Sequence, residues 1–85
     1  MYYKYYLMTD FNDRYRTGDW LIMTECPKEK IEEFASLSHK LCNEGYVDYE
    51  GMNFSDCWSD MDYLIRLIEY DRYECRVIDF DMIEW

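Results

Sequence analysis

This 85-residue chain has little of what usually marks long loops, zinc sites or membrane segments. It contains one proline and three glycines, so we expect a compact chain with short turns. With one histidine and no Cys-x-x-Cys pair, the sequence lacks the ligand spacing of a zinc site. No apolar run reaches about 18 residues, and the opening stretch MYYKYYLMTD has neither a basic leader nor a long apolar core. The sequence therefore predicts neither a membrane span nor a signal peptide.

Basic residues are also scarce. The chain has 19 acidic and 9 basic residues, for a formal net charge of −10. This charge repels a phosphate backbone, so direct nucleic-acid binding is not expected, and it favours a basic protein surface as partner. The hydrophobic fraction of 49% and the aromatic fraction of 20% are too high for a disordered acidic tail. We therefore expect residues 1–85 to form one small acidic domain.

The four cysteines, at positions 26, 42, 57 and 75, would allow two disulfides. They stand singly within apolar segments, and no secretory signal precedes them. We expect reduced thiols that serve as small apolar residues in a cytoplasmic protein.

Hydrophobic periodicity predicts an α+β fold of order β-β-α-(β)-α-β. We expect a three- to four-stranded antiparallel or mixed sheet with two helices on one face. The expected elements are strands at 2–9 and 20–25, a helix at 27–43, a short strand or extended loop at 46–50, a helix at 56–69, and a strand at 73–82.

The apolar spacing also predicts which residues of the helices are buried. In the first helix the expected stripe is Ile31, Phe34, Leu37 and Leu41. In the second helix, with Asn53 or Ser55 as its N-cap, the expected stripe is Trp58, Met61, Leu64, Ile65 and Ile68.

The last strand alternates apolar and acidic residues. We expect Ile78, Phe80 and Met82 to face the core. Asp79 and Asp81 would then face away from it, because successive side chains of a strand point to opposite sides.

Metal binding has one candidate in the stretch DCWSDMD, where Asp56 and Asp60 are one helical turn apart and Asp62 follows. The stretch does not match a calcium loop. Asp56 can instead support the helix N-terminus, and Asp62 can pair with Arg66. We expect no metal and no cofactor.

Catalysis has one candidate in His39 and Cys42, which lie one turn apart on the first predicted helix. That placement aims a thiol poorly into a cleft. The sequence also has no glycine-rich phosphate loop and no serine nucleophile elbow, so we do not expect an enzyme.

Tyrosines are concentrated in the first strand. Stacking of nucleic-acid bases on them would need a basic groove, and few basic residues are near. Tyrosine also suits strands and protein interfaces. The first strand places Tyr3, Tyr5 and Leu7 on one face.

The acidic excess is concentrated in the second half of the chain. Residues 1–45 hold eight acids and six bases, whereas residues 46–85 hold eleven acids and three bases, a net of −8. Packing a core does not require this excess, and its self-repulsion destabilises a compact domain. The residues predicted to face a partner are Asp62, Glu69, Asp71, Glu74, Asp79, Asp81 and Glu84.

Two carboxylates on one face of a strand, such as Asp79 and Asp81, lie about 6.6–6.8 Å apart. Phosphates follow each other at about 3.4 Å of axis along one DNA strand, so carboxylates at this density can imitate a phosphate track. In size, acidity and lack of catalytic motifs, the chain resembles the small phage and mobile-element inhibitors called anti-CRISPR proteins and DNA-mimic antirestriction proteins. The resemblance is one of composition over the whole chain. It implies a non-enzymatic inhibitor that blocks the nucleic-acid cleft of a CRISPR or restriction nuclease.

The alternative is a homo-oligomeric, for instance homodimeric, or accessory structural domain. Its tyrosine- and tryptophan-rich faces would form the interface, and its acidity would serve solubility only. Ionic strength distinguishes the two, because salt weakens an electrostatic complex far more than an apolar one.

Overall fold

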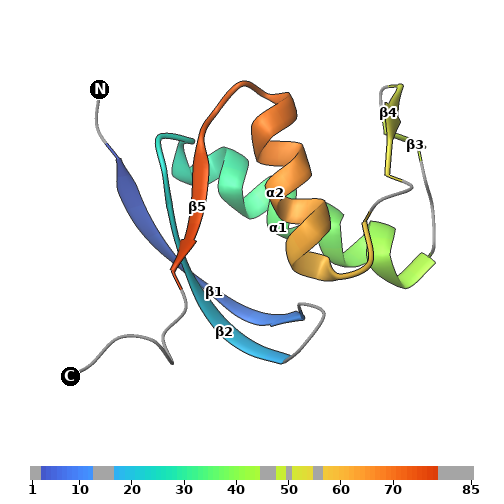
Figure 1. Cartoon of the computed structure of the whole chain (residues 1–85), viewed down its shortest axis with the longest axis horizontal. Helices are drawn as coiled ribbons and strands as arrows, with labels where there is room; N and C mark the ends of the chain where they lie inside the picture. The colour runs from blue at the N-terminus through green and yellow to red at the C-terminus, as the bar shows by residue number, and fades with distance from the viewer. Residues whose placement is uncertain (1–2, 13–16, 45–47, 50, 55–56, 79–85) are drawn as a thin grey trace.

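The computed structural model describes residues 3–12, 17–44, 48–49, 51–54 and 57–78. It confirms the α+β class: an antiparallel sheet of strand order β1-β2-β5 carries two helices on one face (Figure 1). In chain order the elements are β1 (Lys4–Asn12), β2 (Thr17–Thr24), α1 (Lys28–Glu44), β3 (Asp48–Tyr49), β4 (Met52–Asn53), α2 (Asp60–Tyr70) and β5 (Cys75–Ile78). Strands β3 and β4 form a separate two-stranded sheet, drawn at the right of Figure 1.

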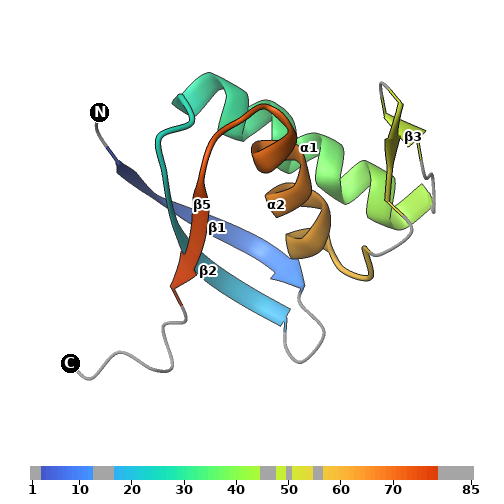
Figure 2. The same cartoon turned by 45° about the horizontal axis from the view of Figure 1, so that its top comes forward.

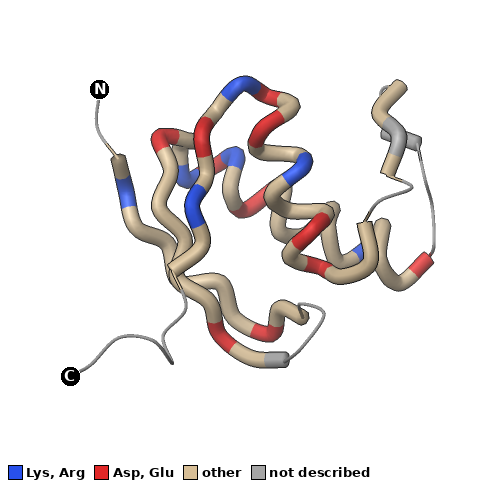
Figure 3. The backbone as a smooth tube through the Cα atoms, in the orientation of Figure 1, with Lys and Arg blue, Asp and Glu red and all other residues tan. Residues whose placement is uncertain are grey.

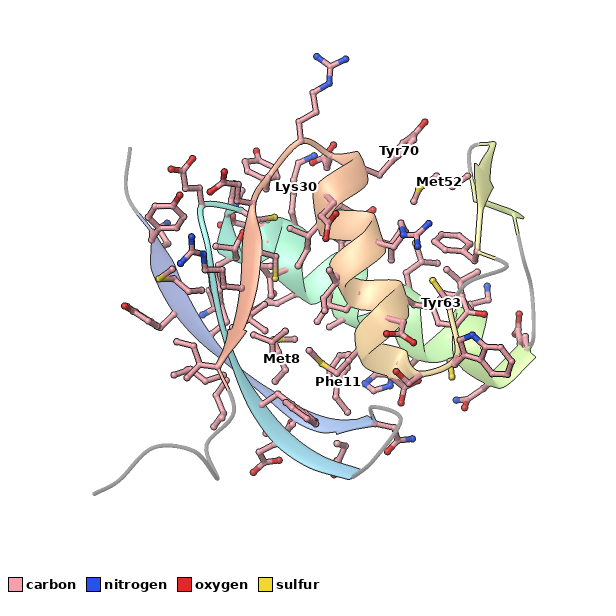
Figure 4. The ribbon with its side chains drawn as sticks, viewed as in Figure 1. Met8, Phe11, Lys30, Met52, Tyr63 and Tyr70 are labelled. Atoms are coloured by element: carbon pink, nitrogen blue, oxygen red, sulfur yellow. The ribbon has the colours of Figure 1, made fainter. Side chains whose placement is uncertain are left out.

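Strands β1 and β2 form the predicted antiparallel hairpin and are longer than expected. Met8 and Phe11 are three residues apart, so a regular strand would point them to opposite faces. Both are buried, because the register shifts between them and Asp10 takes a left-handed φ of 60°. This bulge adds one residue and returns Phe11 to the core side. Figure 4 shows Met8 and Phe11 between the sheet and α2.

Helix α1 agrees with its prediction in position and in most of its buried stripe. Its first turn is closed by the Ile31 N–H, which donates to the Pro27 carbonyl at 3.0 Å. Ile31, Phe34 and Leu41 are buried, and Leu37 is half-buried. The apolar period of the sequence therefore identified the face that packs against the rest of the domain.

Helix α2 begins later than predicted. Its N-cap is Ser59, whose side chain accepts a hydrogen bond from the Asp62 N–H at 3.4 Å. Asn53, a predicted cap, belongs instead to β4, and Ser55 lies outside the described residues. Trp58 precedes the helix and is 73% exposed, so the prediction that it is buried is wrong.

The remaining apolar residues of α2 occupy the core. The buried ones are Met61, Tyr63, Leu64, Leu67 and Ile68. Ile65, which was predicted to be buried, is half-buried and packs against this core. In Figure 2, α1 and α2 stand on the same side of the sheet, and the core fills the layer between them. Neither helix in the described ranges is long and apolar enough to cross a membrane.

Strand β5 pairs antiparallel with β2, and this pairing corrects its predicted orientation. Val77 lies opposite Ile22, which is fully buried, whereas Ile78 lies opposite Leu21. Directly opposed residues share a face, so Val77 is on the helix-covered face and Ile78 is on the other one. The prediction that Ile78 faces the core is wrong. The predicted orientations of residues 79–82 lie outside the described residues.

Candidate functional site

Four of the seven predicted partner-facing residues lie in the described part of the chain. They are Asp62, Glu69, Asp71 and Glu74, and they follow one continuous path along α2 and the turn into β5. Asp79, Asp81 and Glu84 lie outside the described residues. Asp62 and Glu69 are seven residues apart on α2, which places them on one side of the helix, about 10 Å apart along its axis.

Asp62 and Asp71 are engaged in local structure at the two ends of α2. The Asp62 carboxylate accepts a hydrogen bond from the Trp58 N–H at 2.9 Å, in the first turn of the helix. Asp71 is the C-cap, and its Oδ2 lies 2.8 Å from the ammonium nitrogen of Lys30 on α1. This hydrogen bond raises the pKa of Lys30 and keeps its charge next to Asp71. Both carboxylates therefore already have hydrogen-bonding or ionic partners within the chain.

Glu69 and Glu74 are the more available pair. Both are exposed, and both line an open depression of about 500 Å³ at the turn between α2 and β5. Arg72 and Arg76 line the same depression, so the two carboxylates stand among guanidinium groups. Glu74 also accepts a hydrogen bond from the Tyr3 hydroxyl at 2.7 Å, and this bond raises the pKa of Tyr3.

The described stretch carries only part of the acidic excess. Residues 57–78 hold five acids and three bases, a net of −2, and Figure 3 shows basic residues interspersed among the acidic ones from α2 into β5. The other six acids of the second half belong to positions whose side chains the structure does not describe: Asp48, Glu50, Asp56, Asp79, Asp81 and Glu84. A continuous phosphate-like track along the described surface is therefore not present, and the seven-residue surface stays a prediction.

A buried polar cluster that the sequence did not predict lies between α1 and α2. Asp60 is 5% exposed, and its Oδ2 lies 3.4 Å from Nδ1 of His39. Its second oxygen, Oδ1, is buried without a hydrogen-bond partner. The His39 ring packs on Phe11, with 4.3 Å between ring centroids. The capping Ser59 just before Asp60 is the signal that would have placed this carboxylate at a helix start.

The cysteines carry free thiols. Burial raises the pKa of Cys26 to about 11 and that of Cys75 to about 12. Burial and a hydrogen bond to Asp60 raise the pKa of Cys42 to about 11. The thiolate is the nucleophilic form of cysteine, so these values disfavour thiol chemistry near neutral pH.

Metal coordination finds no support in the placed side chains. Within the ranges that the structure describes, no group of three or more His, Cys, Asp or Glu residues could hold a metal ion. Of the three predicted carboxylates, Asp60 contacts His39 and Asp62 contacts the Trp58 N–H, while Asp56 lies outside the described residues.

The chain was compared with protein-family models, curated proteins and solved structures, and none of these comparisons found a match. The function proposed for it is therefore supported by charge, burial and contacts within the chain.

Proposed function

We propose that this protein is a non-enzymatic inhibitor whose acidic C-terminal half docks on a basic, nucleic-acid-binding surface of a protein partner, such as a CRISPR or restriction nuclease. The observation that carries the proposal is the net charge of −8 on residues 46–85, against −2 on residues 1–45. A surface that binds nucleic acid presents lysine and arginine to phosphates, and an acidic protein can occupy the same surface.

The proposal is supported by the effect of the acidic excess on the stability of the isolated protein. Like charges on one half of a small domain repel each other and destabilise the compact state. A basic partner removes this repulsion, and the attraction accelerates encounter and excludes partners of the same sign. A purely solubilising role needs a net charge of magnitude only about 2–8 for a small domain, whereas this chain has −10.

Among the described residues, Glu69 and Glu74 are the proposed contacts, because both are exposed at the open depression. Asp62 and Asp71 border them and hold the ends of α2. The residues proposed to complete the surface are Asp79, Asp81 and Glu84.

The protein is proposed to inhibit by covering the nucleic-acid-binding surface of its partner, without catalysing a reaction. Three of the thiols have raised pKa values. The single histidine packs between Phe11 and the buried carboxylate of Asp60. Neither arrangement presents an activated nucleophile to a substrate.

The test is partner capture with two matched charge variants. The site variant is Asp79→Lys with Asp81→Lys, and the control is Glu33→Lys with Glu44→Lys, two exposed positions on α1. Both variants change the net charge from −10 to −6. Glu33 and Glu44 are exposed, and Asp79 and Asp81 are proposed to be, so we expect near-native melting of both variants, because exposed charges contribute little to stability.

Capture of the partner identified by pull-down and mass spectrometry should weaken strongly in the site variant and stay close to wild type in the control. Wild-type capture should also decline as salt rises. Equal capture by the two variants would mean that overall charge, and not the C-terminal acidic surface, determines binding.

A further inference from the structure

Strand β1 is an edge of the three-stranded sheet. The strand order is β1-β2-β5, and β1 stands at the left of the sheet in Figure 1. In the part of the chain that the structure describes, no strand pairs with its outer side. Alternate backbone N–H and C=O groups of an edge strand point away from the sheet and stay unpaired. The regular stretch of β1 before its bulge, Lys4–Met8, presents such a row.

A small cavity lies beside this edge, between β1 and α1. Its volume is about 190 Å³, and its lining is mostly apolar. Tyr6 and Met8 line it from β1, and Ile31 and Ala35 line it from α1. The Tyr6 hydroxyl donates to the Cys26 carbonyl at 2.8 Å, which fixes this wall of the cavity in place.

The size of the cavity indicates what it can hold. Sites for cofactors and drug-sized ligands have volumes of about 300–1,000 Å³, so this cavity is too small for them. An apolar cavity of about 150 Å³ is known to hold one benzene molecule. The cavity between β1 and α1 therefore has room for one aliphatic side chain.

We propose that an extended segment of a protein partner adds to β1 as a further strand and places one aliphatic side chain in this cavity. Tyr6 pairs with the fully buried Ile22, so Tyr6 and Met8 are on the helix-covered face. A partner residue beside either of them points to the same face, towards α1. Strand addition of this kind obtains affinity from main-chain hydrogen bonds and specificity from side-chain pockets.

The β1 strand of a second copy does not fit this description. Its side chains on the helix-covered face are Lys4, Tyr6 and Met8. Met8 is buried in its own core, the Tyr6 hydroxyl is bonded within its own chain, and Lys4 is charged. None of them is an unused aliphatic side chain. The net charge of −10 also opposes the association of two copies through either edge of the sheet.

Charge indicates what flanks the aliphatic residue of the partner. At the rim of the cavity, Lys28 Nζ lies 4.0 Å from Glu32 Oε1, so the rim itself is balanced. The whole chain has a net charge of −10, so we expect basic residues on either side of the aliphatic one. Neither Glu69 nor Glu74 lines this cavity, and the inference does not depend on the proposed inhibitor function.

The test uses a fluorescein-labelled peptide, Lys-Thr-Val-Thr-Leu-Thr-Val-Lys, and fluorescence anisotropy. Threonine and valine favour an extended strand, and the central leucine is the side chain for the cavity. We expect a dissociation constant between about 10 µM and about 1 mM. A control peptide with serine in place of leucine has the same charge. It should bind at least about tenfold more weakly, because it lacks the buried aliphatic group.

Two variants of the protein form a matched pair. Ala35→Leu fills the cavity and should weaken binding of the leucine peptide at least about tenfold. Ser36→Leu adds the same side chain at an exposed position on α1 and should bind the peptide close to wild type. Circular dichroism melts verify that both variants are folded. If Ala35→Leu is not folded, the comparison of the leucine and serine peptides decides the matter.

Strand addition itself has a separate signature. Methylation of one alternate set of peptide nitrogens should abolish binding, whereas methylation of the other set should preserve it, because only one set faces β1. In the complex, amide hydrogen exchange should slow at alternate residues of Lys4–Met8. At a salt concentration that screens charge, Asp79→Lys with Asp81→Lys should bind the peptide like wild type, so the two proposals can fail separately.

Three results would overturn this inference. The first is no binding of the leucine peptide at about 1 mM, or equal binding of the leucine and serine peptides. The second is an equal effect of the two methylation patterns. The third is a dimer of the chain that protects the β1 amides without peptide, because the occupant of the edge would then be a second copy.

Discussion

Trp20 and Trp58 are the same residue type in two different environments, one buried and one exposed. Trp20 is 4% exposed, and its indole N–H donates to the Phe11 carbonyl at 3.1 Å. Trp58 stands before the first residue of α2 and is 73% exposed. The same substitution, Trp→Ala, therefore tests a buried, hydrogen-bonded indole against an exposed one with an identical chemical change.

Truncating a buried tryptophan to alanine costs about 3–5 kcal/mol, and the Phe11 carbonyl would also lose its donor. A chain of 85 residues is expected to have a total stability of about 4–13 kcal/mol. Trp20→Ala should lower the melting temperature by more than about 12 °C, or leave the chain unfolded. Trp58→Ala should change stability by less than about 0.5 kcal/mol, which is about 4 °C or less.

Urea and thermal unfolding followed by far-UV circular dichroism give both values. Trp20→Phe is the intermediate variant, because it keeps an aromatic ring and removes the N–H; we expect a loss of about 1–3 kcal/mol. Equal losses for Trp20→Ala and Trp58→Ala would refute the reasoning. Trp58 would then be packed, and α2 would have to begin before Ser59.

Three further predictions concern single groups. Thr24→Val should cost about 1–3 kcal/mol in urea unfolding, because the buried Thr24 hydroxyl donates to the Glu74 carbonyl at 2.5 Å and accepts from the Cys26 N–H at 3.2 Å. Ser59→Ala should cost about 1 kcal/mol, and Ser59→Asp should retain most of the cap, as helix content and unfolding will show. Burial raises the pKa of the Cys26 thiol from 9.0 to about 11, so the unfolded chain loses this proton first. The free energy of unfolding should be maintained below pH 9 and fall between about pH 9 and pH 11, and Cys26→Ala should reduce that slope.

The elements with one clear period were predictable from the sequence. Helix α1 has a single apolar stripe, a proline before its first turn and no competing cap, so its bounds and buried face agree with the prediction. The alternation in β1 also placed Tyr5 and Leu7 on one face, as the register shows. The apolar spacing was therefore sufficient to predict an element where it was compatible with only one secondary structure and one buried face.

Two predictions failed because local pattern allowed more than one answer. Asn53, Ser55 and Ser59 are all good N-cap residues, and only the packing of Met61 and Leu64 into the core selects Ser59. For the small sheet of β3 and β4, the sequence predicted only a short strand or an extended loop at 46–50. Gly51, with a left-handed φ of 84° between them, is its turn signal.

The orientation of β5 could not be obtained from its own residues. Val77 and Ile78 are adjacent and both apolar, so the apolar pattern does not show which of them lies on the helix-covered face, and Val77 is itself 37% exposed. Only the register with Leu21 and Ile22 on β2, more than 50 residues earlier in the chain, decides between them.

In the candidate site, too, the sequence predicted some features and could not predict others. Counting charges located the acidic excess in the second half of the chain. It could not show that Asp71 meets Lys30, which lies 41 residues earlier, or that Glu69 and Glu74 share a depression with Arg72. Charge totals are additive along a sequence, whereas ion pairs depend on how the elements pack.

The most direct test of the proposed inhibitor function is the salt dependence of the dissociation constant for the captured partner. We expect wild-type affinity to fall steeply as salt rises, with a shallower fall for Asp79→Lys with Asp81→Lys, because fewer charges then contribute. An affinity that is independent of salt, or a double variant that follows the wild-type curve, would contradict docking through the acidic half.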